Sequence, residues 1–277
     1  MTTTRFAPSP SGRLHLGHAY SAVVGRGAGA RFFLRIEDLD AGRCKPEFVD
    51  GIFEDLRWLG IAWDGEPVVQ SARTADYDAA LDALRDRGLV YPCFCTRADI
   101  AASLTAPHGD AASAYPGTCR DLPDDPARRA ATAHSWRLDS AKAVALAGLP
   151  SWSEEEVRCH AGDSDIGDAI LARKDAPAAY HLACVVDDAA SEVMLVVRGA
   201  DLRPSTPVQR LLQEVLDLPE PTYLHHPLVA HADGRRLAKR DLAPTLAAMR
   251  DAGVDGPALA ADLATGRLPL EYRFIEA

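Results

Sequence analysis

Two histidines near the amino terminus, His15 and His18, stand three residues apart and directly follow a loop rich in proline and glycine. Residues three apart share one face of a helix, so the two rings are expected to lie together. A helix start offers free N–H groups and the positive end of the helix dipole, and imidazoles there can donate hydrogen bonds to a phosphate. Gly17 between them lets a flat ring approach the backbone closely. By itself this spacing is more often that of ordinary core or surface histidines, so the residues alone offer a phosphate site only as the alternative interpretation.

A second group of residues able to do chemistry is formed by Cys93, Cys95 and Cys119, together with Tyr115. Three thiolates leave one position of a tetrahedral zinc site open, and a phenolate can fill it because the metal lowers the pKa of a tyrosine. From the residues alone, a zinc site and a group of buried free cysteines are equally good interpretations. The remaining cysteines lie apart and are interpreted as core or incidental thiols: Cys44, Cys159 and Cys184.

The elements that must position these groups alternate between strands and helices. Apolar residues recur at helical spacing from Pro46 to Leu59, and Ser205 or Thr206 is the expected N-cap of a later helix. Strands are expected at 4–8, 31–38 and 192–199, and helices at 15–30, 46–59, 77–88 and 204–216. Residues 91–135 lack this periodicity and are interpreted as an insertion. The alternation on both sides of it predicts an α/β fold with a parallel sheet, in which ligands bind at the carboxyl ends of the strands.

The bulk composition excludes several classes of protein. The chain has 277 residues, of which 47% are hydrophobic and 25% charged, as in ordinary globular proteins. No apolar run reaches the ~18 residues of a membrane helix, and the first motif starts too early to leave room for a signal peptide, so we expect a cytoplasmic protein. The net charge of −10 argues against binding of nucleic acid over the whole surface. A local basic patch is formed by Arg235, Arg236, Lys239 and Arg240.

Five motifs occur in an order that is itself informative. "APSPSGRLHLGH" at 7–18 resembles the "HIGH" signature of class I aminoacyl-tRNA synthetases, in the form used by the glutamyl and glutaminyl branch. Similar matches to that branch follow through nearly the whole chain: "RIEDLD" at 35–40, "AYHLACVVDD" at 179–188, "VRGADL" at 197–202 and, resembling the "KMSKS" loop, "RRLAKRD" at 235–241. Five motifs in order are far more specific than any one of them.

Residues 242–277 have room only for two short helices, at 243–253 and 256–266, where a full-length glutamyl-tRNA synthetase has a large anticodon-binding region. The chain therefore resembles the truncated paralogues, the glutamyl-queuosine tRNA(Asp) synthetases. This resemblance implies a Rossmann-type catalytic domain in two halves, 1–90 and 136–241, with a small zinc-bearing insertion, a short helical tail and no anticodon-binding domain.

The implied reaction is the ATP-dependent activation of L-glutamate to glutamyl-adenylate, followed by transfer to the queuosine base at the wobble position of tRNA(Asp). The implied partners are ATP with Mg²⁺, L-glutamate and the anticodon stem-loop of tRNA(Asp), and we expect the protein to act as a monomer. Three alternatives stay open: glutamylation of the 3′ end of tRNA(Glu) or tRNA(Gln), ligation of glutamate to a non-RNA acceptor, and a non-catalytic module that binds tRNA or zinc.

The resemblance also assigns roles to residues. It implies that ATP is bound by His15, Gly17, His18 and Lys239, with the two histidines and Lys239 acting in catalysis. It implies that glutamate is bound by Arg5, Ala7, Ser9, Glu37, Tyr180 and Arg198, and that one structural Zn²⁺ is bound by Cys93, Cys95, Tyr115 and Cys119. The two guanidinium groups suit the side-chain carboxylate and Glu37 suits the ammonium group. Without the motifs, Arg5, Glu37 and Arg198 would be interpreted as surface ion pairs.

The chain departs from the family pattern at two places. Ala238 replaces the usual serine of the "KMSKS" loop, with Arg236 at the position of a lysine or arginine, and the lost hydroxyl hydrogen bond is worth about 1 kcal/mol. We expect slower or looser closure of that loop. Cys184 replaces an asparagine and removes a polar contact. Asp187 and Asp188 are expected to cap or bond locally and are left outside the site.

Overall fold

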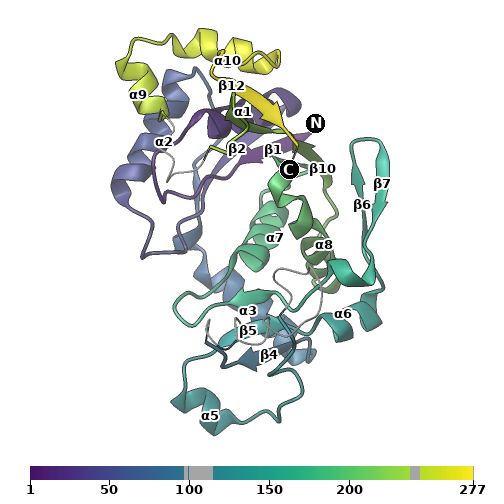
Figure 1. The fold of residues 1–277 in the computed structure, drawn as a ribbon. Helices are drawn as coiled ribbons and strands as arrows, with labels where there is room; N and C mark the ends of the chain where they lie inside the picture. Colours follow the sequence, from purple (N-terminus) through teal and green to yellow (C-terminus); the bar gives the residue numbers. More distant parts are fainter. Residues whose placement is uncertain (97–98, 100–114, 238–243, 277) are drawn as a thin grey trace.

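A computed structural model describes residues 1–96, 99, 115–237 and 244–276 of the chain (Figure 1). Its central strands are parallel, as the sequence predicts: β1 (Thr3–Phe6) pairs with β2 (Arg31–Ile36), β2 with β3 (Val68–Val69), and β9 (Leu195–Gly199) with β10 (Thr222–His226). β1 and β9 lie side by side, and the backbone N of Met194 donates to the carbonyl of Thr3 at 3.0 Å. The resulting order β3-β2-β1-β9-β10 is that of a Rossmann-type sheet.

Helices cover both faces of this sheet. In β1, the Thr4 hydroxyl donates to the carbonyl of Gly25 in α1 (Leu16–Ala28), whereas the next residue, Arg5, contacts Asp188 in α7 (Tyr180–Ala190). Because successive side chains of a strand point to opposite faces, α1 and α7 lie on opposite sides of the sheet. The glycines of α1 help it to pack closely, since a Cβ atom on Gly25 would lie 3.2 Å from the Phe32 ring.

The other helices that the sequence predicted are present. They are α2 (Pro46–Trp58), α3 (Thr74–Asp86) and α8 (Thr206–Val215). Ser205 occupies the N-cap position of α8 but its side chain makes no capping hydrogen bond, and Pro207 lies in the first turn. One hydrophobic core joins α1 and α2 to the sheet, and a second joins α3, α7 and α8. Short 3₁₀ helices complete the frame: Gln70–Ala72, Asp163–Asp165 and Ala200–Ser205.

The stretch predicted as an insertion belongs to a separate antiparallel sheet. β5 (Ser135–Leu138) lies between β4 (Val90–Cys93) and β8 (Ile170–Ala172), and α5 (Pro126–Ala131) precedes it. Since β8 comes from far beyond residue 135, this sheet is built from two distant parts of the sequence. Figure 1 shows it at the end of the molecule opposite the helical tail.

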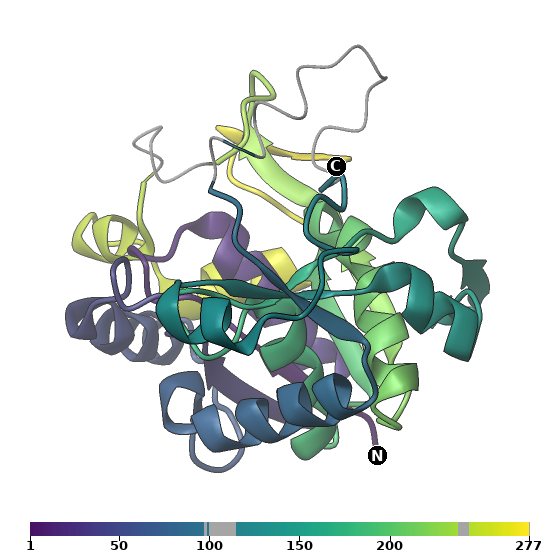
Figure 2. The ribbon, with the colours of Figure 1, turned by 90° about the horizontal axis from the view of Figure 1, so that it is seen from below.

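The remaining elements include four strands that the sequence patterns did not reveal. α6 (Ser140–Ala147) leads to a hairpin of β6 (Ser151–Glu154) and β7 (Val157–His160). The tail holds the two expected short helices, α9 (Leu246–Asp251) and α10 (Gly256–Ala264). It ends in β12 (Tyr272–Ile275), which pairs antiparallel with β11 (Leu228–His231), as Figure 2 shows. No helix among the described residues is long and apolar enough to cross a membrane.

Candidate active site

A cavity of about 580 Å³ opens at the carboxyl ends of β1 and β9. The chain leaves these neighbouring strands toward opposite edges of the sheet, which is the place where parallel α/β sheets form their binding crevice. Its lining includes nine residues that the resemblance implied: Arg5, Ala7, Ser9, His15, Gly17, His18, Glu37, Tyr180 and Arg198. It also includes residues for which the resemblance implied no role, among them Ser21, Asp201, His226 and Arg236. The structure therefore gathers these nine residues at one place, while their individual roles stay predictions.

The histidine pair forms the first turn of α1. Nδ1 of His15 accepts a hydrogen bond from the backbone N of Gly17 at 3.2 Å, and Nδ1 of His18 accepts one from the backbone N of His15 at 3.1 Å. The ring centroids lie 3.9 Å apart. Because Nδ1 is the acceptor in both rings, each neutral imidazole carries its proton on Nε2 and can donate from there. The pair thus adds two donors to a helix start that already attracts anions.

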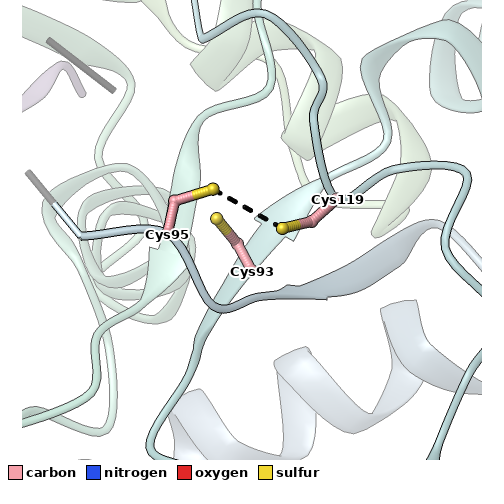
Figure 3. Close-up of side chains that lie close together, drawn as sticks. All are labelled: Cys93, Cys95 and Cys119. Carbon is pink, nitrogen blue, oxygen red and sulfur yellow. Dashed lines mark hydrogen bonds between the residues drawn. The ribbon is translucent and has the colours of Figure 1, made fainter. Parts of the chain in front are cut away.

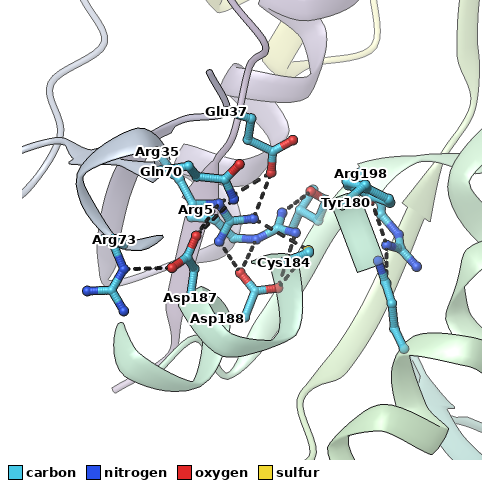
Figure 4. A network of polar contacts seen from close by, with 12 residues as sticks. Arg5, Arg35, Glu37, Gln70, Arg73, Tyr180, Cys184, Asp187, Asp188 and Arg198 are labelled. Atoms are coloured by element: carbon cyan, nitrogen blue, oxygen red, sulfur yellow. Dashed lines mark hydrogen bonds and ion pairs between the residues drawn. The ribbon is translucent and has the colours of Figure 1, made fainter. Parts of the chain in front are cut away.

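Arg5 is buried and its charge is already balanced. Its Nε donates to Asp188 Oδ1 at 3.0 Å and its NH1 group donates to the carbonyl of Val197 at 3.0 Å (Figure 4). Asp188 also accepts from Arg35 at 2.5 Å. Burial alone would raise the pKa of Asp188, but the two guanidinium groups outweigh it and hold that pKa well below its usual range. Asp188 is therefore a carboxylate that fixes the orientation of Arg5.

The expectation that Asp187 and Asp188 bond locally is wrong. Asp187 accepts from Gln70 at 2.9 Å, from Arg73 at 2.7 Å and from the Tyr77 hydroxyl at 2.9 Å, all on other elements. Both carboxylates are buried, and a buried carboxylate is stable only when its oxygens are paired. The two residues thus join α7 to the sheet and to α3 through long-range polar contacts.

Arg198 is buried as well, but its partners are neutral. Its guanidinium donates to Gln209 Oε1 at 2.6 Å, to Thr206 Oγ1 at 2.8 Å, to His225 Nε2 at 3.1 Å and to the Tyr180 hydroxyl at 3.3 Å. Burial and the nearby Arg198 lower the pKa of His225 to about 4, so this imidazole is neutral at pH 7. Within the described ranges no carboxylate pairs directly with Arg198, although His225 Nδ1 lies 3.0 Å from Glu154 Oε1 on its other side. The guanidinium at the cavity therefore has only neutral direct partners.

Glu37 faces the cavity from the end of β2. It accepts from Arg35 at 3.0 Å and keeps 13% of its side-chain surface exposed. Burial raises the pKa of Glu37 from its ordinary value, although Arg35 opposes this. Cys184 contacts Asp188 and Arg35 at 3.5 Å each and is not part of the cavity lining. The cysteine that replaces the family's asparagine thus lies behind the cavity wall.

Sequence reasoning missed the residues that hold the two arginines in place. Asp188 and Arg35 anchor Arg5, while Gln209 and His225 anchor Arg198. A signal for Arg35 was available, because a charged residue inside the apolar strand 31–36 must be buried and paired. No comparable signal existed for Gln209 or His225, since their partner comes from a different segment of the chain.

The loop that resembles "KMSKS" is described only at its start. Arg236 and Leu237 line the cavity. Lys239, for which a catalytic role is expected, and Ala238, which departs from the family pattern, lie outside the described residues.

Comparisons with known proteins identify the family. A family model described as "tRNA synthetases class I (E and Q), catalytic domain" matches residues 1–264. The Glutamyl-Q tRNA(Asp) synthetase of Rhodobacter capsulatus is 44% identical over 270 residues, which cover 90% of this chain and 95% of that protein. The Glutamyl-Q tRNA(Asp) synthetase of Nocardia farcinica is 47% identical over 257 residues, which cover 90% of this chain and 79% of that protein. The chain belongs to the glutamyl-Q tRNA(Asp) synthetase family.

Solved structures agree with this fold. The glutamate-tRNA synthetase of Elizabethkingia anophelis matches with a TM-score of 0.79 and 25% identity over 95% of this chain. A glutamate tRNA ligase of Elizabethkingia meningosepticum, solved in complex with its amino acid, matches with the same TM-score and identity. This member of the glutamyl-Q tRNA(Asp) synthetase family spans 61% and 60% of those two chains.

The antiparallel sheet of β4, β5 and β8 in this glutamyl-Q tRNA(Asp) synthetase family member carries the cysteine group (Figure 3). The sulfur atoms of Cys93, Cys95 and Cys119 lie within 4.8 Å of one another, and those of Cys95 and Cys119 are 3.6 Å apart. The Tyr115 hydroxyl lies 3.4 Å from the sulfur of Cys93 and 3.5 Å from that of Cys95. Two segments of the chain thus bring three sulfurs and one oxygen to the same point.

These distances fit a tetrahedral metal site. Zn–S bonds of about 2.3 Å and a Zn–O bond of about 2.0 Å place ligand sulfurs about 3.8 Å apart and an oxygen about 3.5 Å from each sulfur. The guanidinium of Arg137 lies 3.8 Å from the centre of the Tyr115 ring, and Lys174 Nζ donates to the carbonyls of Phe94 and Cys95 at 3.3 Å. The two cations would offset the negative charge of ionised ligands.

Proposed function

We propose that this chain uses ATP to convert L-glutamate to glutamyl-adenylate and then transfers the glutamyl group to the queuosine base at the wobble position of tRNA(Asp). The observation that carries the proposal is the cavity, where a guanidinium with neutral direct partners and a carboxylate face the start of a helix that suits phosphate. An amino acid with an acidic side chain and a nucleotide can therefore meet in one place. The names of the relatives support the choice of acceptor.

Charge assigns unequal roles to the two arginines. Arg198 has no anionic partner among the described residues, so a bound side-chain carboxylate supplies the missing counter-ion. The charge of Arg5 is balanced by Asp188, so Arg5 mainly orients the bound glutamate by hydrogen bonds and by the shape of the cavity wall. Glu37 binds the ammonium group of glutamate. The Tyr180 hydroxyl, 3.3 Å from the Arg198 guanidinium, closes the glutamate pocket beside Arg198. Ala7 and Ser9 line the loop between these groups and the histidines.

The reaction needs positioning and charge stabilisation more than covalent help. The α-carboxylate oxygen of glutamate attacks the α-phosphorus of ATP, and the bond to the bridging oxygen breaks so that pyrophosphate leaves with the electron pair. His15 and His18 donate from Nε2 to the phosphate oxygens as charge grows, and Lys239 neutralises the leaving group. Mg²⁺ that arrives with ATP supplies further positive charge. A hydroxyl of the RNA base then attacks the acyl carbon, and AMP leaves.

The cysteine group is proposed to hold one structural Zn²⁺. Cys93, Cys95 and Cys119 supply thiolates and Tyr115 a phenolate, so that no position stays open for substrate. The metal would tie the end of β4 to the segment that contains Tyr115 and Cys119. Its task is to stabilise this sheet, and the adenylation chemistry takes place elsewhere.

The acceptor is proposed to be the anticodon stem-loop of tRNA(Asp), bound by a monomer in the cytoplasm. A short stem-loop needs few phosphate contacts, which is compatible with a net charge of −10. Glutamylation of a tRNA 3′ end is the competing reaction.

The deciding experiment compares transfer of radiolabelled glutamate, with Mg-ATP, to two tRNA(Asp) preparations that differ only in queuosine or guanosine at the wobble position. We expect label only on the queuosine tRNA, in a form that persists after the 3′-terminal nucleotides are removed. Label that is lost with the 3′ end would establish the competing reaction. Glutamate-dependent ATP–pyrophosphate exchange without any tRNA reports on the first step separately, and its absence would contradict the proposed adenylation.

A further inference from the structure

A series of contacting aromatic rings and guanidinium groups lies along one face of the β4–β5 sheet. Arg128 lies 4.0 Å from the centre of the Phe94 ring, Phe94 and His134 have centroids 5.5 Å apart, His134 and Trp136 5.3 Å, and Arg85 lies 4.7 Å from the Trp136 ring. These five residues, here called the aromatic strip, come from α3, the end of β4, α5 and β5. Separate parts of the chain thus converge on one continuous surface.

The sheet has two different faces because side chains alternate along its strands. Cys93 and Arg137 point to the face of the proposed zinc site, where Tyr115 and Cys119 are also buried. Trp136 pairs across the strands with Pro92 and lies on the other face. At its inner end that face packs against the core formed by α3 and α8. At its outer end it continues as the aromatic strip.

The aromatic strip remains open to solvent. The rings of Phe94, His134 and Trp136 are only partly buried, while Arg85 and Arg128 are exposed. Arg85 pairs with Asp82 at 2.6 Å, but Arg128 pairs with no carboxylate among the residues that the structure describes. A protein with a net charge of −10 therefore presents two guanidinium groups at this place, and they lie over the rings of Phe94 and Trp136.

We propose that the aromatic strip is a stacking platform for unpaired bases of the tRNA loop. RNA-binding proteins recognise loops by stacking splayed bases on aromatic rings and guanidinium planes, and adjacent cations contact the phosphates. The successive contacts of Arg128, Phe94, His134 and Trp136 bring both kinds of group together on one surface. This inference rests on the proposed function for the identity of the RNA, because the strip itself suits single-stranded RNA in general.

A chain of contacts joins the strip to the rim of the catalytic cavity. Lys174 donates to the carbonyl of Phe94 at 3.3 Å, and its neighbour Arg173 lies 3.4 Å from Asp40. Asp40 follows Glu37, which lines the cavity, by three residues. These contacts link the backbone of Phe94 to the segment that carries Glu37.

The test measures binding without any acyl transfer. Fluorescence anisotropy gives the Kd of an unmodified tRNA(Asp) transcript and of its anticodon stem-loop, with ATP and glutamate absent. Phe94→Leu and Trp136→Leu keep an apolar side chain but remove the π face, and we expect each to raise Kd about 5- to 100-fold. Phe94→Tyr and Trp136→Phe keep the π face and are expected to bind within about threefold of the parent protein.

Arg128→Gln tests the cation of the strip, with Arg158→Gln as its control. Both remove one exposed arginine, but Arg158 lies on β7 and pairs with Glu220. We expect only Arg128→Gln to weaken binding, by about 3- to 10-fold in low salt, and to reduce the salt dependence of Kd. Since Trp136 also packs against the core, Phe94→Leu and Arg128→Gln keep the test informative if Trp136→Leu fails to fold.

The outcomes separate this proposal from the proposed function. Leu variants that retain parental tRNA-free ATP–pyrophosphate exchange and also parental RNA affinity would overturn the stacking platform and leave the function intact. Weakened RNA binding by Leu variants of a protein that glutamylates neither tRNA would support the platform and contradict the function. A dimer that dissociates in Phe94→Leu would show instead that the strip is an interface between two copies.

Discussion

At the scale of single residues, the partner of each arginine decides what that arginine can do. Arg5 and Arg198 both lie at the ends of neighbouring strands and both are buried. Asp188 balances the first, whereas neutral groups hold the second. A buried charge without a counter-ion is costly in the empty protein, and an anionic substrate relieves that cost. The same pair of residue types therefore divides into one structural guanidinium and one that recognises the ligand.

Asp188→Asn is expected to destabilise the protein and to weaken glutamate binding. It leaves Arg5 and Arg35 without their shared carboxylate, and loss of one member of a buried pair costs about 3–5 kcal/mol. Urea unfolding measures the free energy, and ATP–pyrophosphate exchange measures the KM for glutamate. Cys184→Ser is the matched control, because Cys184 contacts the same carboxylate at 3.5 Å without charge. Equal effects of the two variants would contradict the role given to Asp188.

Two substitutions at His15 separate its two tasks. His15→Ala removes both the N-cap of α1 and the proposed phosphate donor, so we expect a loss of about 0.5–2 kcal/mol in stability and a large fall in exchange activity. His15→Asn supplies another good N-cap side chain but no imidazole. It is expected to restore the stability and not the activity. Thermal unfolding and exchange rates measured on both variants test this, and an active Asn variant would show that His15 serves only as a cap.

At the scale of elements, the β4–β5–β8 sheet combines two proposed sites on its two faces. Phe94 of the aromatic strip stands between Cys93 and Cys95 of the proposed zinc site. A metal that fixes both cysteines also fixes the backbone that carries Phe94. The two proposed sites are thus linked through three consecutive residues, Cys93, Phe94 and Cys95.

Removal of the metal should affect RNA binding more than adenylation. We expect about one zinc per chain by elemental analysis of the purified protein. Cys119→Ser should lower the zinc content and the thermal stability, and raise the Kd for the tRNA transcript, while glutamate-dependent exchange without tRNA changes little. Cys159→Ser, at a thiol outside the cluster, is the control. A Cys119→Ser protein with full zinc content would exclude the proposed site.

At the scale of the whole molecule, buried histidines link stability to pH. Burial lowers the pKa of His181 and His225 to about 4 and lowers that of His226 as well. The unfolded chain therefore binds more protons than the folded protein between about pH 6.5 and pH 4. Asp55, whose pKa burial raises to about 6, and Glu37, whose pKa burial also raises, act in the opposite direction, because their folded forms take up a proton first.

Three histidines outweigh Asp55 and Glu37, so the free energy of unfolding should fall as the pH is lowered from 7 to 5. Chemical denaturation at pH 7, 6 and 5 measures this dependence. His181→Gln removes one titrating group and is expected to flatten it, whereas Asp55→Asn should make it steeper. Stability that is constant or rises toward pH 5 would contradict the neutral, buried state of these histidines.

The sequence determined the family, the alternation of strands and helices, and nine residues of the cavity lining. The alternation depends on local patterns, whereas the family and the nine residues followed from the resemblance of motifs that occur in order. A histidine pair after a Pro- and Gly-rich loop, or cysteines one residue apart, can be read from neighbours in the chain. The short helices of the tail were predictable for the same reason, since apolar spacing and glycine stops are local.

Only the tertiary structure decided which charges meet. Asp188 contacts Arg5 across 183 positions of sequence, and β8 completes a sheet with strands from far earlier in the chain. Long-range pairing follows from how two faces pack, which no local pattern records. The division of labour between Arg5 and Arg198, and the convergence of Arg85, Phe94, Arg128, His134 and Trp136 on one surface, therefore became visible only when the chain was folded.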